Sequence, residues 1–147
     1  MSTPHPTHAR VNVVVDREIA DVLRLEAKKV VMFEHDLFED FLDFSPDAQY
    51  GLSMRFRTAF DVIDILGWHP EKTDPTATSF EVPLTDDLIN LLGLRHHDLA
   101  MTNADRLDDL DVNEPIESEL LAEITITRLA IQALNRLFGA YAEATKA

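Results

Sequence analysis

Large apolar residues occupy every second position along two short stretches of the chain, residues 11–15 and 80–84, with Asn12 and Val14 or Glu81 and Pro83 between them. An apolar side chain at every second position is typical of a β-strand that buries one face. Pro83 has no amide hydrogen, which predicts that the second strand lies at a sheet edge or leaves this position unpaired. Each stretch is followed by a residue whose side chain can cap a helix, Asp16 or Thr85. The pattern therefore predicts two strands that each lead directly into a helix.

Beyond each strand the apolar residues recur three and four positions apart, which is the spacing of amphipathic helices. The spacing predicts four helices, over residues 16–44, 46–66, 86–110 and 115–144. Pro46 follows the capping residue Ser45, as is common at a helix start, and Pro115 is expected to play the same part. Gly67 is expected to end the second helix. Gly93 lies inside the third helix, where a tight crossing with another helix would explain it.

The succession of a strand and a helix occurs twice in the sequence, at a constant offset in residue number. The stretch from Val11 to Leu25 is matched 69 positions later by the stretch from Phe80 to Leu94, without a gap. One hypothesis is a duplicated β-α-α unit. The alternative is a coincidence between two ordinary strand-to-helix junctions, because few side chains are identical between the halves.

These patterns predict a mainly α fold, a four-helix bundle-like domain with two short β-strands. The expected divisions are a flexible tail over 1–9 and a single α-rich domain over 10–147, with halves 10–68 and 79–147 and a polar linker over 69–79.

The amino-acid composition excludes several kinds of partner and site. The 147 residues include 27 acidic and 13 basic residues, which gives a formal net charge of −14. Such a charge argues against partners rich in phosphate, so we expect neither nucleic-acid binding nor attachment to an anionic membrane. The chain has no cysteine, which excludes disulfides and thiolate metal sites and fits a reducing cytoplasm. No apolar run is long enough to span a bilayer.

Acidic residues that could bind a metal gather in two sets: Asp36, Asp40 and Asp43 on the first predicted helix, Asp61 and Asp64 on the second. Hard divalent cations take carboxylate ligands of this kind. If these helices run antiparallel from a turn near Ser45, the two sets lie on the order of 15 Å apart. We therefore expect a solvated acidic surface, with an ion pair between Lys29 and Asp61, and no metal site.

Four side chains could meet in a polar pocket between helices: His35, Arg55, His97 and Arg128. An antiparallel turn near Val112 would bring His97 close to Arg128, and pockets between helices are common ligand sites. The chain carries no Gly-x-Ser-x-Gly elbow, no His-Glu-x-x-His motif and no phosphate-binding glycine loop. These four residues are therefore candidates for ligand binding and not for catalysis, and no cofactor is expected.

Two functional hypotheses follow. The first is a small acidic cytoplasmic interaction protein without enzymatic activity. It would bind a protein partner and act as a homodimer, because the first and fourth predicted helices are apolar over more than one face. The alternative is a helical bundle that binds a small molecule or a divalent metal, and such a bundle could be an enzyme.

Overall fold

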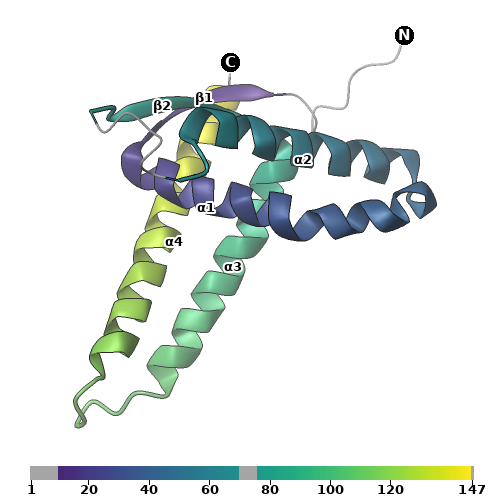
Figure 1. Cartoon of the computed structure of the whole chain (residues 1–147). Helices are drawn as coiled ribbons and strands as arrows, with labels where there is room; N and C mark the ends of the chain where they lie inside the picture. The colour runs from purple at the N-terminus through teal and green to yellow at the C-terminus, as the bar shows by residue number, and fades with distance from the viewer. Residues whose placement is uncertain (1–9, 70–75, 147) are drawn as a thin grey trace.

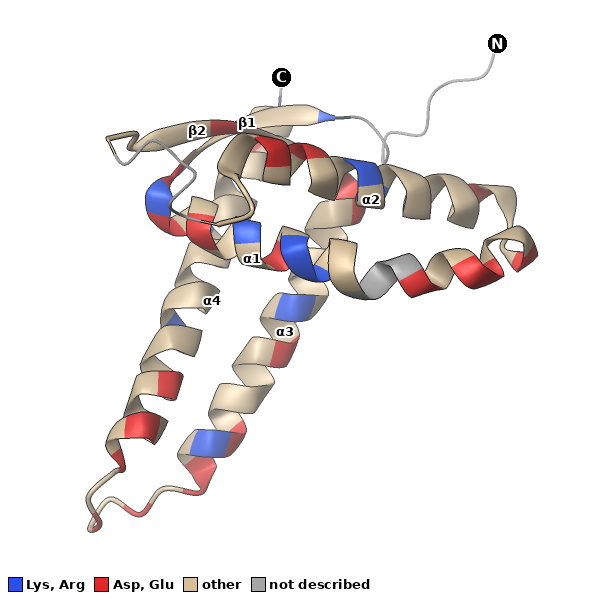
Figure 2. Cartoon of the chain, in the orientation of Figure 1, with Lys and Arg blue, Asp and Glu red and all other residues tan. Residues whose placement is uncertain are grey.

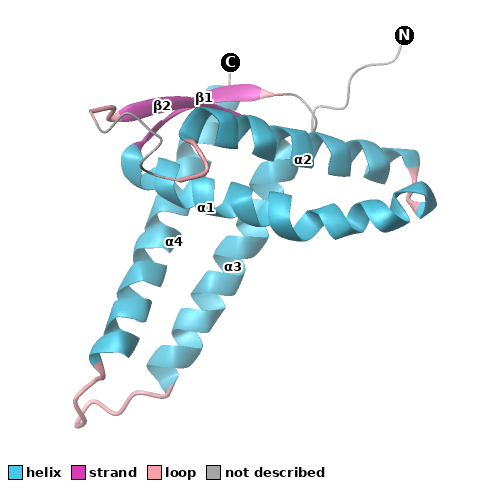
Figure 3. Ribbon diagram, in the orientation of Figure 1, coloured by secondary structure: helices cyan, strands magenta, loops and turns pink. Residues whose placement is uncertain are grey.

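The computed structural model describes residues 10–69 and 76–146, and their side chains except those of Phe33, Glu34 and His35. The elements in chain order are β1 (Val11–Asp16), α1 (Arg17–Phe33), the 3-10 helix η2 (Glu34–Asp43), α2 (Pro46–Leu66), β2 (Ser79–Leu84), α3 (Asp86–Asp108) and α4 (Ser118–Thr145). The fold is mainly α with two short strands, as predicted (Figure 3). The expected tail and most of the expected linker lie outside the described residues.

The two strands form an antiparallel ribbon in which Val13 lies opposite Val82. These two valines are separated by the same 69 positions as the sequence repeat. When equivalent residues of two antiparallel strands face one another, a local two-fold axis passes between them. In a two-stranded ribbon both strands are edge strands, which is the position that Pro83 requires.

The helices follow the same approximate two-fold symmetry. Within each half the helices form a hairpin, α1 with α2 and α3 with α4. Between the halves the contacts are exchanged, so that α4 packs on β1 while α2 packs on β2. The two helical hairpins leave the ribbon in different directions (Figure 1). Among the described residues, no helix has both the length and the apolar character needed to cross a membrane.

Both strand-to-helix junctions are capped at equivalent positions. The carboxylate of Asp16 accepts a hydrogen bond from the amide of Ile19 at 2.9 Å. The hydroxyl of Thr85 accepts one from the amide of Leu88 at 3.3 Å. Each bond satisfies an amide that the first helical turn leaves unpaired. The two predicted capping residues are therefore confirmed.

The second helix also begins and ends as predicted. Ser45 caps α2, where its hydroxyl accepts a hydrogen bond from the amide of Ala48 at 3.2 Å. Gly67 ends the helix at a φ of 80°, and its amide donates to the carbonyl of Ile63 at 2.7 Å. A positive φ of this size is open to glycine without steric cost.

The prediction of one continuous helix over residues 16–44 is wrong in its second part. The α-helix ends at Phe33, and residues Glu34–Asp43 continue as a 3-10 helix. Side chains three positions apart lie above one another in a 3-10 helix. Phe38 and Phe41 are three positions apart and stack, with their ring centroids 5.4 Å apart. Phe38 also contacts Phe56 of α2 edge-on, with a distance of 5.1 Å between the ring centroids. Aromatic contacts thus accompany the change of helix type.

Two further expectations are corrected. Pro115 does not open the fourth helix, because α4 begins at Ser118. Pro115 and Ile116 instead belong to the connection, and Glu117 with an extended backbone is the N-cap of α4. Gly93 is not at a tight crossing, since a Cβ placed there would meet no atom within 4 Å.

The hydrophobic core lies beneath the ribbon and contains residues from both halves. Leu23 of α1 and Leu92 of α3, which are 69 positions apart, are both completely buried. Toward the ends of α2 and α4 that lie in the core, three pairs of buried positions correspond at an offset of 71: Val62 and Ala133, Ile63 and Leu134, and Leu66 and Leu137. The change from 69 to 71 means that the segment between equivalent core positions, such as Leu23 to Leu66 and Leu92 to Leu137, is two residues longer in the second half.

Candidate binding groove between α1, α3 and α4

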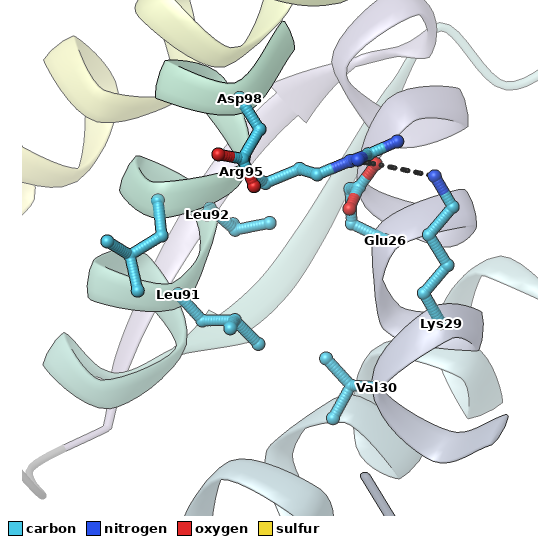
Figure 4. Close-up of a pocket in the computed structure, with 8 residues that line it drawn as sticks. Glu26, Lys29, Val30, Leu91, Leu92, Arg95 and Asp98 are labelled. Atoms are coloured by element: carbon cyan, nitrogen blue, oxygen red, sulfur yellow. Dashed lines mark hydrogen bonds and ion pairs between the residues drawn. The ribbon is translucent and has the colours of Figure 1, made fainter. Parts of the chain in front are cut away.

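Helices α1 and α3 approach one another at an ion pair close to the two-fold axis (Figure 4). Nε of Arg95 lies 3.3 Å from Oε1 of Glu26, and Nζ of Lys29 lies 3.4 Å from the same oxygen. Glu26 and Arg95 are 69 positions apart, so they occupy equivalent places in the two halves. The Glu26 side chain is only 8% exposed, which makes the pair stronger than a solvent-exposed one.

An open groove of about 510 Å³ lies on one side of this ion pair, between α1, α3 and α4. Its apolar lining includes Val22 and Leu25 of α1 and Ile126 and Leu129 of α4. Leu25, Ile126 and Leu129 are 50%, 67% and 56% exposed. Large apolar side chains that gather this openly around a concave surface are typical of a binding site.

A smaller pocket of about 330 Å³ lies on the other side of the ion pair, between α1 and α3. Leu91 and Leu94 line it, and they are the equivalents of Val22 and Leu25 in the larger groove. The two hollows are therefore related by the approximate two-fold axis.

The two hollows differ in the helices that line them: the larger groove includes residues of α4, whereas the smaller pocket is lined by α1 and α3 alone. At the 71-residue offset, Phe56 of α2 corresponds to Thr127 of α4. Phe56 packs against Phe38 and Phe60, with ring centroids 5.1 Å apart in each pair. Thr127 is much smaller and lines the larger groove. The larger groove thus extends onto α4, whereas Phe56 does not line the smaller pocket.

The charged residues that line the larger groove all take part in ion pairs. Asp21 accepts a hydrogen bond from Arg24 at 2.8 Å. Glu18 accepts one from Arg136 at 2.9 Å, a contact that raises the pKa of the Arg136 guanidinium. Lys29 pairs with Glu26 and not, as we predicted, with Asp61, which lies against Arg10. Within the described residues, no three His, Asp or Glu side chains gather in a way that could hold a metal ion.

The four predicted ligand residues lie on different parts of the fold. The side chain of His35, in η2, is outside the described residues. Arg55 is half-buried on α2, whereas His97 on α3 and Arg128 on α4 are exposed. Arg55, His97 and Arg128 are all absent from the lining of the groove and of the smaller pocket. A polar pocket formed by these residues stays a prediction.

Sequence reasoning missed the groove, although one signal for it was present. The repeat places Glu26 and Arg95 at equivalent positions with opposite charge. Residues near a two-fold axis meet their own equivalents, so such a pair predicts a contact between the first helices of the two halves. No sequence pattern indicates the groove itself, because the groove forms between three helices and its volume depends on how they are placed relative to one another.

No protein-family model, curated protein or solved structure matches this chain.

Proposed function

We propose that the chain is a non-enzymatic interaction protein and that the groove between α1, α3 and α4 is its binding surface. The observation that carries the proposal is the exposure of Leu25, Ile126 and Leu129 around one concave surface. Burying such side chains stabilises a complex by about 25 cal/mol per Å² of apolar surface, before the costs of association. A solvent-facing cluster of this kind therefore favours a macromolecular partner.

The polar groups of the groove support the same function. In small-molecule sites a few polar groups converge on the ligand. Here Glu26, Lys29 and Arg95 are paired with one another at the crossing of α1 and α3. Breaking a half-buried pair to bind a ligand would leave a charge uncompensated. These residues are better suited to holding the two helices than to binding a substrate.

Self-association is the simplest form of such an interaction, and we propose that two copies can cover each other's groove in the cytoplasm. The test is light scattering at 5 to 200 µM protein, at low and high salt. Because each copy carries a charge of −14, screening by salt should favour the dimer. Ile126→Glu should weaken it, whereas Leu42→Glu, which adds the same charge at an 89% exposed site on η2, should not. A monomer under all conditions would rule out the dimer.

The alternative, a bundle that binds a small molecule or a metal, rests on the volume of about 510 Å³, which is within the range of small-molecule sites. A thermal-melt screen with divalent metals and nucleotides separates the two. A ligand present at 100 times its Kd stabilises a protein by about 2.7 kcal/mol. The interaction function predicts no shift, and a shift that is lost in Ala130→Trp would favour the alternative.

A further inference from the structure

We infer that the natural occupant of the groove is an amphipathic helix with a basic polar face, supplied by another protein. This inference rests on the proposed function, since it takes the groove to be a protein-binding surface. It adds the secondary structure and the charge of the partner. Three features support it: the length of the groove, the small residues in its lining, and the charge of the hairpin formed by α3 and α4.

The length of the groove suits a helix of about three turns. Along α1 the lining residues run from Glu18 to Lys29, and along α4 from Ile126 to Ala133. At 1.5 Å per residue, the α1 side is roughly 17 Å long. A helix of about 11 residues has the same length and presents apolar side chains at positions i, i+3, i+4 and i+7.

The lining of the groove on α4 admits the side chains of such a helix. Thr127 and Ala130 are small and line the groove, and each follows a larger lining residue in the sequence, Ile126 and Leu129 respectively. Small residues between large ones form the holes into which the side chains of a packed helix insert. Because Ala130 is small and lines the groove, a bulky side chain at this position would fill it.

The charge of the α3–α4 hairpin favours a basic partner. Residues 98–123 include nine acidic residues and one basic residue, a formal charge of 1 − 9 = −8. Figure 2 shows these acidic residues toward the far end of the hairpin. Around the groove, by contrast, acidic residues are paired with Arg24, Lys29, Arg95 and Arg136. A helix whose apolar face fills the groove would thus meet a strongly negative field beyond it, which attracts lysine and arginine.

The self-association proposed above would use the same apolar surface and compete with this helix, but charge opposes it. A second copy would bring a further net charge of −14 toward the same hairpin. Like charges brought together oppose association, and they do so most at low salt. A basic helix reverses this effect, so its binding should weaken as salt is added while self-association should strengthen.

The test uses two fluorescently labelled probe helices of about 14 residues. Both carry leucines at helical spacing on one face, and their polar faces carry either lysines or glutamates. Fluorescence anisotropy gives the Kd of each probe for the full-length protein, for Ala130→Trp and for Ala142→Trp. Ala142 is exposed on the same helix outside the groove, so its substitution is the matched control. Circular dichroism melts show whether each variant is folded.

We expect the lysine probe to bind the wild type and Ala142→Trp with equal Kd. Its Kd for Ala130→Trp should be at least tenfold higher, and the glutamate probe should bind the wild type at least tenfold more weakly than the lysine probe. If Ala130→Trp does not fold, Ile126→Glu replaces it, with Leu42→Glu as the control of equal charge. Both of these residues are exposed, so the substitutions should be tolerated.

Four results would overturn the inference, and they differ in what they leave of the proposed function. If the lysine probe bound all variants with equal affinity, the charge of the protein would attract the probe and the groove would take no part in binding. Equal affinity of both probes, lost in Ala130→Trp, would keep the groove as a protein-binding surface but remove the basic partner. Failure of both probes, with dimers that Ala130→Trp dissociates, would make the occupant a second copy. Failure of both probes with a monomeric protein would remove the proposed function as well.

Discussion

At the scale of single residues, Arg24 shows how one side chain joins two helices. It is 4% exposed, and its Nε and Nη2 lie 3.2 and 3.1 Å from the carbonyl oxygen of Leu66, at the end of α2. A cation at this place satisfies a terminal carbonyl and complements the negative end of the helix dipole. The equivalent residue in the second half is Gly93, which has no side chain with which to make such a contact.

We predict that Arg24→Met lowers the free energy of unfolding by about 2 kcal/mol, because charge-assisted hydrogen bonds in a buried site are lost. Arg24→Lys should recover only part of this, since lysine cannot reproduce the planar guanidinium fork. Urea unfolding at pH 7 measures both. Arg136→Met is the control, because its ion pairs are exposed and should contribute little. Equal losses in Arg24→Met and Arg136→Met would contradict the role of Arg24.

Tyr141 makes stability depend on pH in the alkaline range. Burial raises the pKa of Tyr141, and so does the hydrogen bond that its hydroxyl donates to Asp86. The folded state therefore favours the neutral phenol, whose ordinary pKa is about 10. The corresponding stability is fully present below about pH 10 and is lost as the pH rises further toward the folded-state pKa.

Tyr141→Phe should lower the free energy of unfolding by about 1 kcal/mol at pH 7 through loss of the hydrogen bond. It should also flatten the fall in stability between about pH 10 and 11. Urea titrations at these pH values give both quantities. Tyr50→Phe removes an exposed phenol and serves as the comparison. A wild type and a Tyr141→Phe variant with parallel pH profiles would refute the assignment.

At the scale of elements, the helices contain two glycines that no contact requires. A Cβ at Gly93 of α3 or at Gly139 of α4 would meet nothing within 4 Å. Alanine has a higher helix propensity than glycine and restricts the unfolded chain. We predict that Gly93→Ala and Gly139→Ala each raise the free energy of unfolding by about 0.5–1 kcal/mol, as measured by urea unfolding. Gly67→Ala should instead destabilise the protein, because of the positive φ at Gly67.

The accuracy of the sequence-based prediction also differs between elements. The strands, the caps at Asp16 and Thr85, and the end of α2 at Gly67 follow from local chemistry, and each was predicted. The 3-10 helix was missed because the contact of Phe38 with Phe56 joins distant parts of the chain. The groove was missed for the same reason, since it forms where three helices from both halves meet.

At the scale of the whole molecule, the far part of the α3–α4 hairpin has little core of its own. Of residues 98–126, all of which are described, only Asn103 is buried, and its amide group donates to the carbonyl of Ile124 at 3.1 Å. Segments with few buried contacts open locally at a small cost in free energy. We predict that amides of this part exchange with solvent much faster than those of residues 19–27. Hydrogen exchange with mass spectrometry measures this, and equal protection of the two regions would contradict it.

The register that sets Val13 against Val82 has one further consequence. In an assembly of two identical β-α-α subunits, a side chain beside the axis would confront a copy of itself, glutamate against glutamate or arginine against arginine. Because one polypeptide here contains both halves, equivalent positions can hold different residues, and Glu26 faces Arg95. Covalent linkage thus turns what would be electrostatic repulsion at the centre of the molecule into attraction.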